Sequence, residues 1–248
     1  MARAVLFDLD GTLVQTESLK AESYAQAAGE LRPGIIDPLT VIRAYDRYVG
    51  LSREAVAQEL LTEFDLTEPA GRIMAELGAS SPRDAFIALR LRIYESMIAD
   101  GTLVRRQELP YATGLVRKLG ADGVPVGLTT VSHAAQAMVV LRALGIQDAF
   151  DIIVTIDDVT HGKPDPEIYL LATARLGIAP VDCLAVEDSV PGIQAAVAAG
   201  IQCVASTNQL TRESVHQAMP MQGVRVVDDP TTLESVVRSM LTTRDGAA

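Results

Sequence analysis

The chain contains little of several residue classes, and each shortage narrows what kind of protein it can be. It has two cysteines, Cys183 and Cys203, both in apolar strand-like runs, which indicates buried thiols rather than a disulfide framework or a zinc site. No run of about 18 apolar residues is present, so no membrane span is predicted. Arg3, Asp8 and Asp10 interrupt the first apolar stretch, so no signal peptide is expected. We therefore expect a cytoplasmic protein.

Positive charge is also scarce. The 248 residues carry 21 Lys and Arg against 32 Asp and Glu, a net charge of −11, which argues against a nucleic-acid partner. We expect no membrane partner either, and a monomer or weak homodimer. Apolar residues make up 48% of the chain, enough for a substantial core in one large domain or two smaller ones.

The most informative stretch is the N-terminal sequence AVLFDLDGTL. Residues 4–7 fit a strand buried on both faces, so Asp8 stands at its carboxyl end, where open parallel sheets bind their ligands. Gly11 allows a sharp turn there. Asp8 and Asp10 lie close enough to repel each other, and either a divalent cation or different protonation states would stabilise them. The alternative is an ordinary strand followed by an acidic turn.

Further strand ends carry polar side chains. A strand at 125–130 ends in hydroxyls, and Ser132 is predicted to cap helix 134–144, whose free N–H groups could bind an anion. Lys163 is one of only three lysines and lies between a glycine and a proline, where an ammonium suits a phosphate or carboxylate, although a solvated loop lysine remains possible.

A second acidic pair, Glu187 and Asp188, ends the strand at 183–187. Two acidic pairs on separate strands favour a magnesium site, because Mg²⁺ takes oxygen ligands and commonly sits beside a substrate phosphate. In the nearby GKPDPEIY segment, Asp165 is predicted to cap a helix at 166–176 that begins with Pro166.

Helix and strand signals divide the chain. The stretch from 17 to 99 contains only predicted helices, which lie at 17–31, 38–49, 52–64, 67–78 and 82–99. Beyond it, helices alternate with strands, and the predicted strands lie at 125–130, 151–155, 183–187, 201–205 and 224–227. Alternation predicts an α/β fold with a doubly wound parallel sheet. We assign residues 1–15 and 105–248 to this catalytic core domain and 16–104 to an inserted α-helical cap domain.

These motifs, taken in order, resemble those of the haloacid dehalogenase superfamily: DLDGTL, the threonine after the second strand, GKPDPEIY and VEDSVPGI. They are most similar to the helical-cap group that includes phosphoglycolate-phosphatase-like enzymes and β-phosphoglucomutase. The resemblance spans residues 4 to about 208. It implies a Rossmann-like core, Mg²⁺ as cofactor and a small phosphorylated substrate.

The resemblance gives the motif residues catalytic roles. Asp8 would attack phosphorus and become an aspartyl phosphate, while Asp10 would act as acid and then base. Thr130 and Lys163 would contact the phosphoryl oxygens. The metal would be held by Asp8, Glu187 and Asp188, with the backbone carbonyl of Asp10, a role that only the resemblance implies. Asp10 disfavours a dehalogenase, in which a halide leaves without a proton.

Substrate choice is assigned to the cap. Gly50, Ser52 and Arg53 resemble the substrate loop of β-phosphoglucomutase, whose arginine holds a distal phosphate; alternatively Ser52 only caps helix 52–64 and Arg53 is solvated. The candidate substrate-binding residues are Thr16, Lys20, Gly50, Ser52, Arg53, Arg90 and Ser132.

Lys20, Arg90 and His133 stand where mutases carry other residues, so hydrolysis is favoured over the alternative of a sugar phosphomutase. A non-enzymatic phosphate-binding or regulatory protein is the third possibility.

Overall fold

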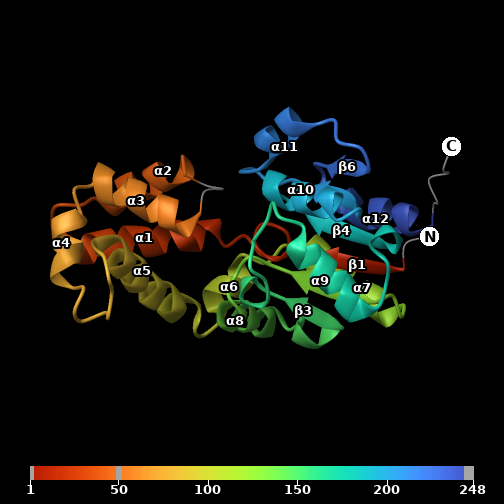
Figure 1. The fold of residues 1–248 in the computed structure, drawn as a ribbon, viewed down its shortest axis with the longest axis horizontal. Helices are drawn as coiled ribbons and strands as arrows, with labels where there is room; N and C mark the ends of the chain where they lie inside the picture. Colours follow the sequence, from red (N-terminus) through yellow and green to blue (C-terminus); the bar gives the residue numbers. More distant parts are fainter. Residues whose placement is uncertain (1–2, 49–51, 243–248) are drawn as a thin grey trace. The chain divides into compact units, whose positions relative to one another are not determined.

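The chain folds into two compact units, drawn in Figure 1. The computed structural model describes residues 3–48 and 52–242. One unit consists of residues 1–15 and 104–248, and the other is the intervening segment from Thr16 to Leu103. Among the described helices, none is both long and apolar enough to cross a membrane.

A six-stranded parallel sheet forms the centre of the first unit, with the strand order β3-β2-β1-β4-β5-β6. The strands are β1 (Ala4–Phe7), β2 (Val126–Thr129), β3 (Ile152–Val154), β4 (Cys183–Glu187), β5 (Gln202–Ser206) and β6 (Val224–Val227). The first, second and fourth of these are entirely buried, as expected for apolar runs inside a parallel sheet. The strand order reverses beside β1, which creates the kind of crevice where such sheets bind ligands.

Helices cover the sheet on both faces (Figure 1). The helices of this unit are α7 (Pro110–Ala121), α8 (Ala134–Leu144), α9 (Glu167–Leu176), α10 (Val190–Ala198), α11 (Arg212–Ala218) and α12 (Leu233–Thr242), and the short helix α6 (Thr102–Arg106) contains the boundary between the units. On one face, α9 and α10 pack against alternate strand residues, including Leu6, Ala185 and Cys203. On the other, α7 and α12 contact each other and β2, β4 and β5. Cys183 and Cys203 are free and buried, which confirms that prediction.

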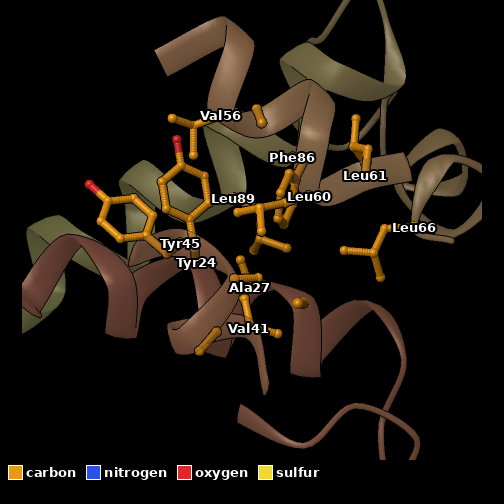
Figure 2. Packing of buried hydrophobic residues seen from close by; sticks show 14 of the residues in the cluster. Tyr24, Ala27, Val41, Tyr45, Val56, Leu60, Leu61, Leu66, Phe86 and Leu89 are labelled. Atoms are coloured by element: carbon orange, nitrogen blue, oxygen red, sulfur yellow. The ribbon is translucent and has the colours of Figure 1, made fainter. Parts of the chain in front are cut away.

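The second unit is entirely helical in its described part. It contains α1 (Glu17–Leu31), α2 (Pro38–Asp46), α3 (Arg53–Glu63), α4 (Thr67–Arg72) and α5 (Pro82–Ile98). Its core is a cluster of aliphatic and aromatic side chains, in which Tyr24, Tyr45 and Phe86 lie together (Figure 2). The side chains of Asp37, Ser52 and Ser81 accept N–H groups at the starts of α2, α3 and α5, which fixes where these helices begin.

Several predicted element boundaries are wrong. The helix predicted at 67–78 ends at Arg72, after Gly71, a poor helix former, and the chain continues in turns. Helix α2 ends at Asp46 rather than 49. Helix α9 begins at Glu167, one residue later than predicted, although Asp165 does accept its first N–H. The short helices α6, α11 and α12 were not predicted.

Candidate active site

The carboxyl ends of four parallel strands bring the polar residues of the sequence motifs to one edge of the sheet. Asp8 follows β1, Thr130 follows β2, Glu187 ends β4, and Asn208 follows β5. Lys163 reaches the same place from the loop between β3 and α9. Residues separated by up to 200 positions therefore meet because parallel strands end at a common edge.

Lys163 lies at the centre of this group. Its ammonium nitrogen Nζ is 2.7 Å from Asp8 Oδ1, 2.5 Å from Glu187 Oε1 and 3.0 Å from the carbonyl oxygen of Thr129. Its side chain is only 5% exposed, so the alternative of a solvated loop lysine is wrong. An ammonium has three protons, and the protein supplies three acceptors for them.

Asp188 is held by Asn208 and lies close to Gly11. Its Oδ2 accepts a hydrogen bond from Asn208 Nδ2 at 2.8 Å, and the same amide also donates to the carbonyl of Gly11. Gly11 has φ of +87°, and a Cβ at that position would lie 2.2 Å from Asp188 Oδ2. Glycine is therefore required here both for the turn and for the approach of the carboxylate.

Asp10 and Thr130 each contact the β2–α8 loop. Ser132 Oγ donates to Asp10 Oδ2 at 2.5 Å, and the N–H of Ser132 donates to Thr130 Oγ1 at 3.0 Å. The prediction that Ser132 caps α8 is wrong: its hydroxyl is used by Asp10, and the Asp157 carboxylate accepts the first N–H of the helix instead.

Negative charge exceeds positive charge at this edge of the sheet, and the pKa values of Asp8 and Asp188 are raised. Burial raises the pKa of Asp8 from 3.8 to about 7, with Glu187 adding to the rise and Lys163 opposing it. Burial, followed by Asp8 and Glu187, also raises the pKa of Asp188 well above its usual range. Burial alone would lower the pKa of Lys163, but the carboxylates of Asp8 and Glu187 outweigh it and raise that pKa. One ammonium cannot neutralise three buried carboxyl groups.

The donor set fits a hard divalent cation. Asp8, Glu187 and Asp188 are all buried, and each offers an oxygen within 4.8 Å of the others. Glu187 Oε2 is buried, and no described residue makes a hydrogen bond to it. Oxygen ligands, surplus negative charge and an unsatisfied carboxylate oxygen match the requirements of Mg²⁺.

Most of the remaining candidate residues belong to the second unit, Thr16–Leu103, which we call the cap unit. Ser52 accepts the N–H of Ala55, so it does cap α3, and Arg53 follows as the first residue of that helix. Lys20 lies 2.7 Å from Glu17. Thr16 is fully buried. Gly50 lies outside the described residues.

Arg90 differs from the other cap cations. It is 4% exposed, and its guanidinium lies over the rings of Tyr24 and Tyr94 at 4.9 and 4.7 Å from their centroids. Its Nε is buried and has no hydrogen-bond partner within residues 3–48 and 52–242. The positive charges of Arg90, Arg53 and Lys20 each oppose the rise that burial produces in the pKa of Tyr24, so three cations lie near one tyrosine. Positive charge is therefore concentrated around Tyr24 in this unit.

Sequence reasoning missed three residues at the core site. Asn208 follows the end of β5, a position that strand order alone would have indicated. Tyr169 donates from its hydroxyl to Glu187 Oε1 at 2.6 Å, and a Cβ at Gly192 would lie 2.0 Å from Glu187 Oε2. Both belong to motifs used in the prediction, but nothing in their spacing indicates these contacts.

Comparison with known proteins gives a consistent picture. The model of the haloacid dehalogenase-like hydrolase family matches residues 2–200. Validoxylamine A 7'-phosphate phosphatase from Streptomyces hygroscopicus subsp. limoneus is 32% identical over 218 residues, which cover 88% of this chain and 92% of that protein. Phosphoglycolate phosphatase from Shigella dysenteriae serotype 1 (strain Sd197) is 31% identical over 212 residues, covering 83% and 81%.

The fold also has close counterparts among solved structures. The structure of β-phosphoglucomutase from Clostridium difficile superposes with a TM-score of 0.70 at 24% identity and covers 97% of both chains. At that identity the likeness establishes the fold, and it confirms the predicted doubly wound core with an inserted helical cap.

Proposed function

The chain belongs to the haloacid dehalogenase-like hydrolases and is an enzyme of the phosphatase type, and we propose that it hydrolyses a small phosphorylated metabolite with Mg²⁺. The substrate class is a sugar phosphate or a phosphoglycolate-like compound, and the reaction passes through an aspartyl phosphate on Asp8. The observation that carries this proposal is the group at the sheet edge: Lys163 bound to Asp8 and Glu187, with Asp188 beside them.

Asp8, Glu187 and Asp188 would hold the metal, together with the backbone carbonyl of Asp10. Mg²⁺ bound there would offset the negative charges of the nucleophile and of the phosphate, which otherwise repel each other. Two observations support a cation site here. Glu187 Oε2 is buried and no described residue makes a hydrogen bond to it, and the pKa values of Asp8 and Asp188 are raised, as expected where negative charge is not fully balanced.

The first step forms the aspartyl phosphate. A carboxylate oxygen of Asp8 attacks phosphorus in line, and the bond from phosphorus to the leaving oxygen breaks. Asp10 donates its proton to that leaving oxygen, so the alcohol departs neutral. Lys163 and the Thr130 hydroxyl stabilise charge on the equatorial oxygens. Thr130 is suited to this role because it accepts the Ser132 N–H and keeps its own proton for donation.

The second step hydrolyses the intermediate. Asp10, now a carboxylate, removes a proton from water, and the water oxygen attacks phosphorus. The bond between phosphorus and the Asp8 oxygen breaks, which releases inorganic phosphate and restores the carboxylate. The hydrogen bond from Ser132 to Asp10 supports this double role, because it orients the carboxyl group without fixing its protonation state.

The cap cations contribute to substrate choice. A buried guanidinium N–H without an acceptor carries a desolvation penalty, which an anionic ligand group would relieve. Arg90, with its unsatisfied Nε, is such a group, and Arg53 and Lys20 add positive charge near it. We propose that these residues, with Thr16, Ser52 and Gly50, recognise the part of the substrate that is not cleaved.

A phosphomutase of the β-phosphoglucomutase type is the second candidate, favoured by the similarity of fold. In a mutase the phosphoenzyme must be shielded from water while the substrate reorients. Lys20 and His133, which differ from the mutase pattern, are engaged by Glu17 and Asp157 in this chain. We therefore favour transfer to water.

The decisive experiment is a phosphate-release screen across sugar phosphates, phosphoglycolate, glycerol phosphate and nucleotides, with and without Mg²⁺. Asp8→Asn should lose at least 1,000-fold in turnover, a drop of about 4 kcal/mol in transition-state stabilisation, while keeping the wild-type circular dichroism spectrum. Activity within tenfold of wild type in that variant would refute the mechanism.

The mutase alternative needs its own assay. With β-glucose 1-phosphate and a trace of glucose 1,6-bisphosphate, we expect free phosphate as the main product. Formation of glucose 6-phosphate with little free phosphate would replace the hydrolase proposal by the mutase.

A further inference from the structure

Tyr169 on α9 is a fully buried tyrosine whose hydroxyl points at a proposed metal-binding carboxylate. The hydroxyl donates to Glu187 Oε1 at 2.6 Å. The hydroxyl is the donor of this bond and the Glu187 carboxylate is its acceptor.

The same ring also contacts Lys163. The Lys163 ammonium lies 5.4 Å from the centroid of the Tyr169 ring, within the range of a cation–π interaction. Tyr169 thus touches both members of the buried Lys163–Glu187 ion pair, one through its hydroxyl and one through its ring.

Glu187 is restricted on its other side as well. Its Oε1 receives two donors, Lys163 Nζ and the Tyr169 hydroxyl, while its Oε2 faces the backbone of Gly192, where no Cβ intervenes. Rotation of the carboxyl group would break both hydrogen bonds in a fully buried position, where an unmade hydrogen bond is costly. The orientation of Glu187 is therefore set by its neighbours before any ligand arrives.

We propose that Tyr169 is a positioning residue for the cation site: through the hydrogen bond to Glu187 Oε1 it fixes the carboxylate in the orientation that binds the metal. The inference rests on the proposed function, since it assumes that Glu187 belongs to a metal site. It goes beyond that function by assigning a role to a residue outside the proposed set of metal ligands and phosphate-binding groups. Hydrogen-bonded neighbours of metal ligands commonly contribute 10–100-fold to metal affinity.

The test is the dissociation constant for Mg²⁺, measured by calorimetry on the chelated full-length protein without substrate. Tyr169→Phe keeps the ring and removes the hydroxyl, and we expect affinity to fall about tenfold. The matched control is Tyr45→Phe, because the Tyr45 hydroxyl also donates to a carboxylate, Glu17 Oε2, at 2.6 Å, but in the cap unit. Tyr45→Phe should leave the dissociation constant unchanged within about twofold.

A double-mutant cycle separates positioning from a general loss of packing. If Tyr169 acts through Glu187, Tyr169→Phe should weaken binding less than about twofold when Glu187→Gln is already present. Mn²⁺ detected by electron paramagnetic resonance extends the measurable range for the weaker variants. If Glu187→Gln abolishes binding of both ions, the cycle cannot be completed. The proposal is then tested by the Mg²⁺ dissociation constants of Tyr169→Phe and Tyr45→Phe alone.

Each result has a defined meaning. Unchanged Mg²⁺ affinity in Tyr169→Phe, or an equal loss with and without Glu187→Gln, would overturn the positioning role and leave the proposed function intact. Failure of the wild-type protein itself to bind Mg²⁺ or Mn²⁺ would overturn the proposed function and this inference together.

Discussion

Replacing Gly192 by alanine tests whether the Glu187 carboxylate is as tightly enclosed as the structure indicates. Gly192 lies in the first turn of α10, where alanine would ordinarily favour the helix by up to about 1 kcal/mol. Here, however, the new Cβ would lie 2.0 Å from Glu187 Oε2, 2.2 Å from its Cδ and 2.4 Å from Oε1. Those atoms cannot retreat easily, because Lys163 and Tyr169 hold Oε1.

The magnitude follows from these opposing effects. Overpacking of a close-packed interior costs about 1–3 kcal/mol, which exceeds the gain in helix propensity. We expect Gly192→Ala to destabilise the protein by about 1–2 kcal/mol, a fall in Tm of roughly 2–8 °C for a chain of this size. Displacement of Glu187 should also reduce the rise in Tm that Mg²⁺ produces in the wild-type protein.

Gly114 provides the control. It lies inside α7 of the same unit, and a Cβ there would meet no atom within 4 Å. Gly114→Ala should therefore raise stability by about 0.5–1 kcal/mol. Thermal unfolding followed by far-UV circular dichroism suits a chain without tryptophan. A rise in Tm for Gly192→Ala similar to that for Gly114→Ala would refute the enclosed position of Glu187.

Three further predictions follow from the site. Asp10→Asn should slow hydrolysis of alkyl phosphates at least tenfold more than that of aryl phosphates, whose leaving groups need little protonation; equal losses would contradict an acid role. Arg90→Leu and Arg53→Ala should each raise KM for the best substrate of the screen about tenfold and leave a small aryl phosphate unaffected; unchanged KM would remove these residues from substrate choice. In chelated protein, the Asp8 pKa is raised from 3.8 to about 7, so its stabilising contribution is complete below about pH 4 and is lost as pH rises through 7. The Tm should therefore fall between about pH 4 and 7 without Mg²⁺, and Asp8→Asn should flatten that profile; a flat wild-type profile would contradict the shift.

The sheet and its polar edge could be predicted because the relevant signals are local. Each strand is a short apolar run, and Asp8, Thr130 and Glu187 stand where such runs end. Once parallel pairing is assumed, topology brings these ends together without knowledge of any side-chain contact. The roles assigned to the individual residues stay predictions until the variants are measured.

Contacts across the fold could not be predicted in the same way. Tyr169 and Glu187 are 18 positions apart, and their hydrogen bond depends on how α9 packs on the sheet. Ser132 shows the limit most clearly. Its sequence context fits a helix cap, but its hydroxyl instead binds Asp10, 122 positions away. A local rule failed there because the side chain of Ser132 turns toward the Asp10 carboxylate, and Asp157, another residue distant in sequence, accepts the first N–H of the helix instead.

The contacts of Lys163 also explain why a lysine serves here in a chain whose other cations are mostly arginines. The ammonium is a compact charge with three donors, and Asp8, Glu187 and the Thr129 carbonyl use all three. A planar guanidinium would not fit three acceptors converging on one point. Because no proton of Lys163 is free, contact with a phosphate requires that one bond be exchanged. In the proposed mechanism Asp8 is the partner whose charge would disappear when its oxygen bonds to phosphorus, so formation of the aspartyl phosphate would release Lys163 to the phosphoryl oxygens as they gain charge.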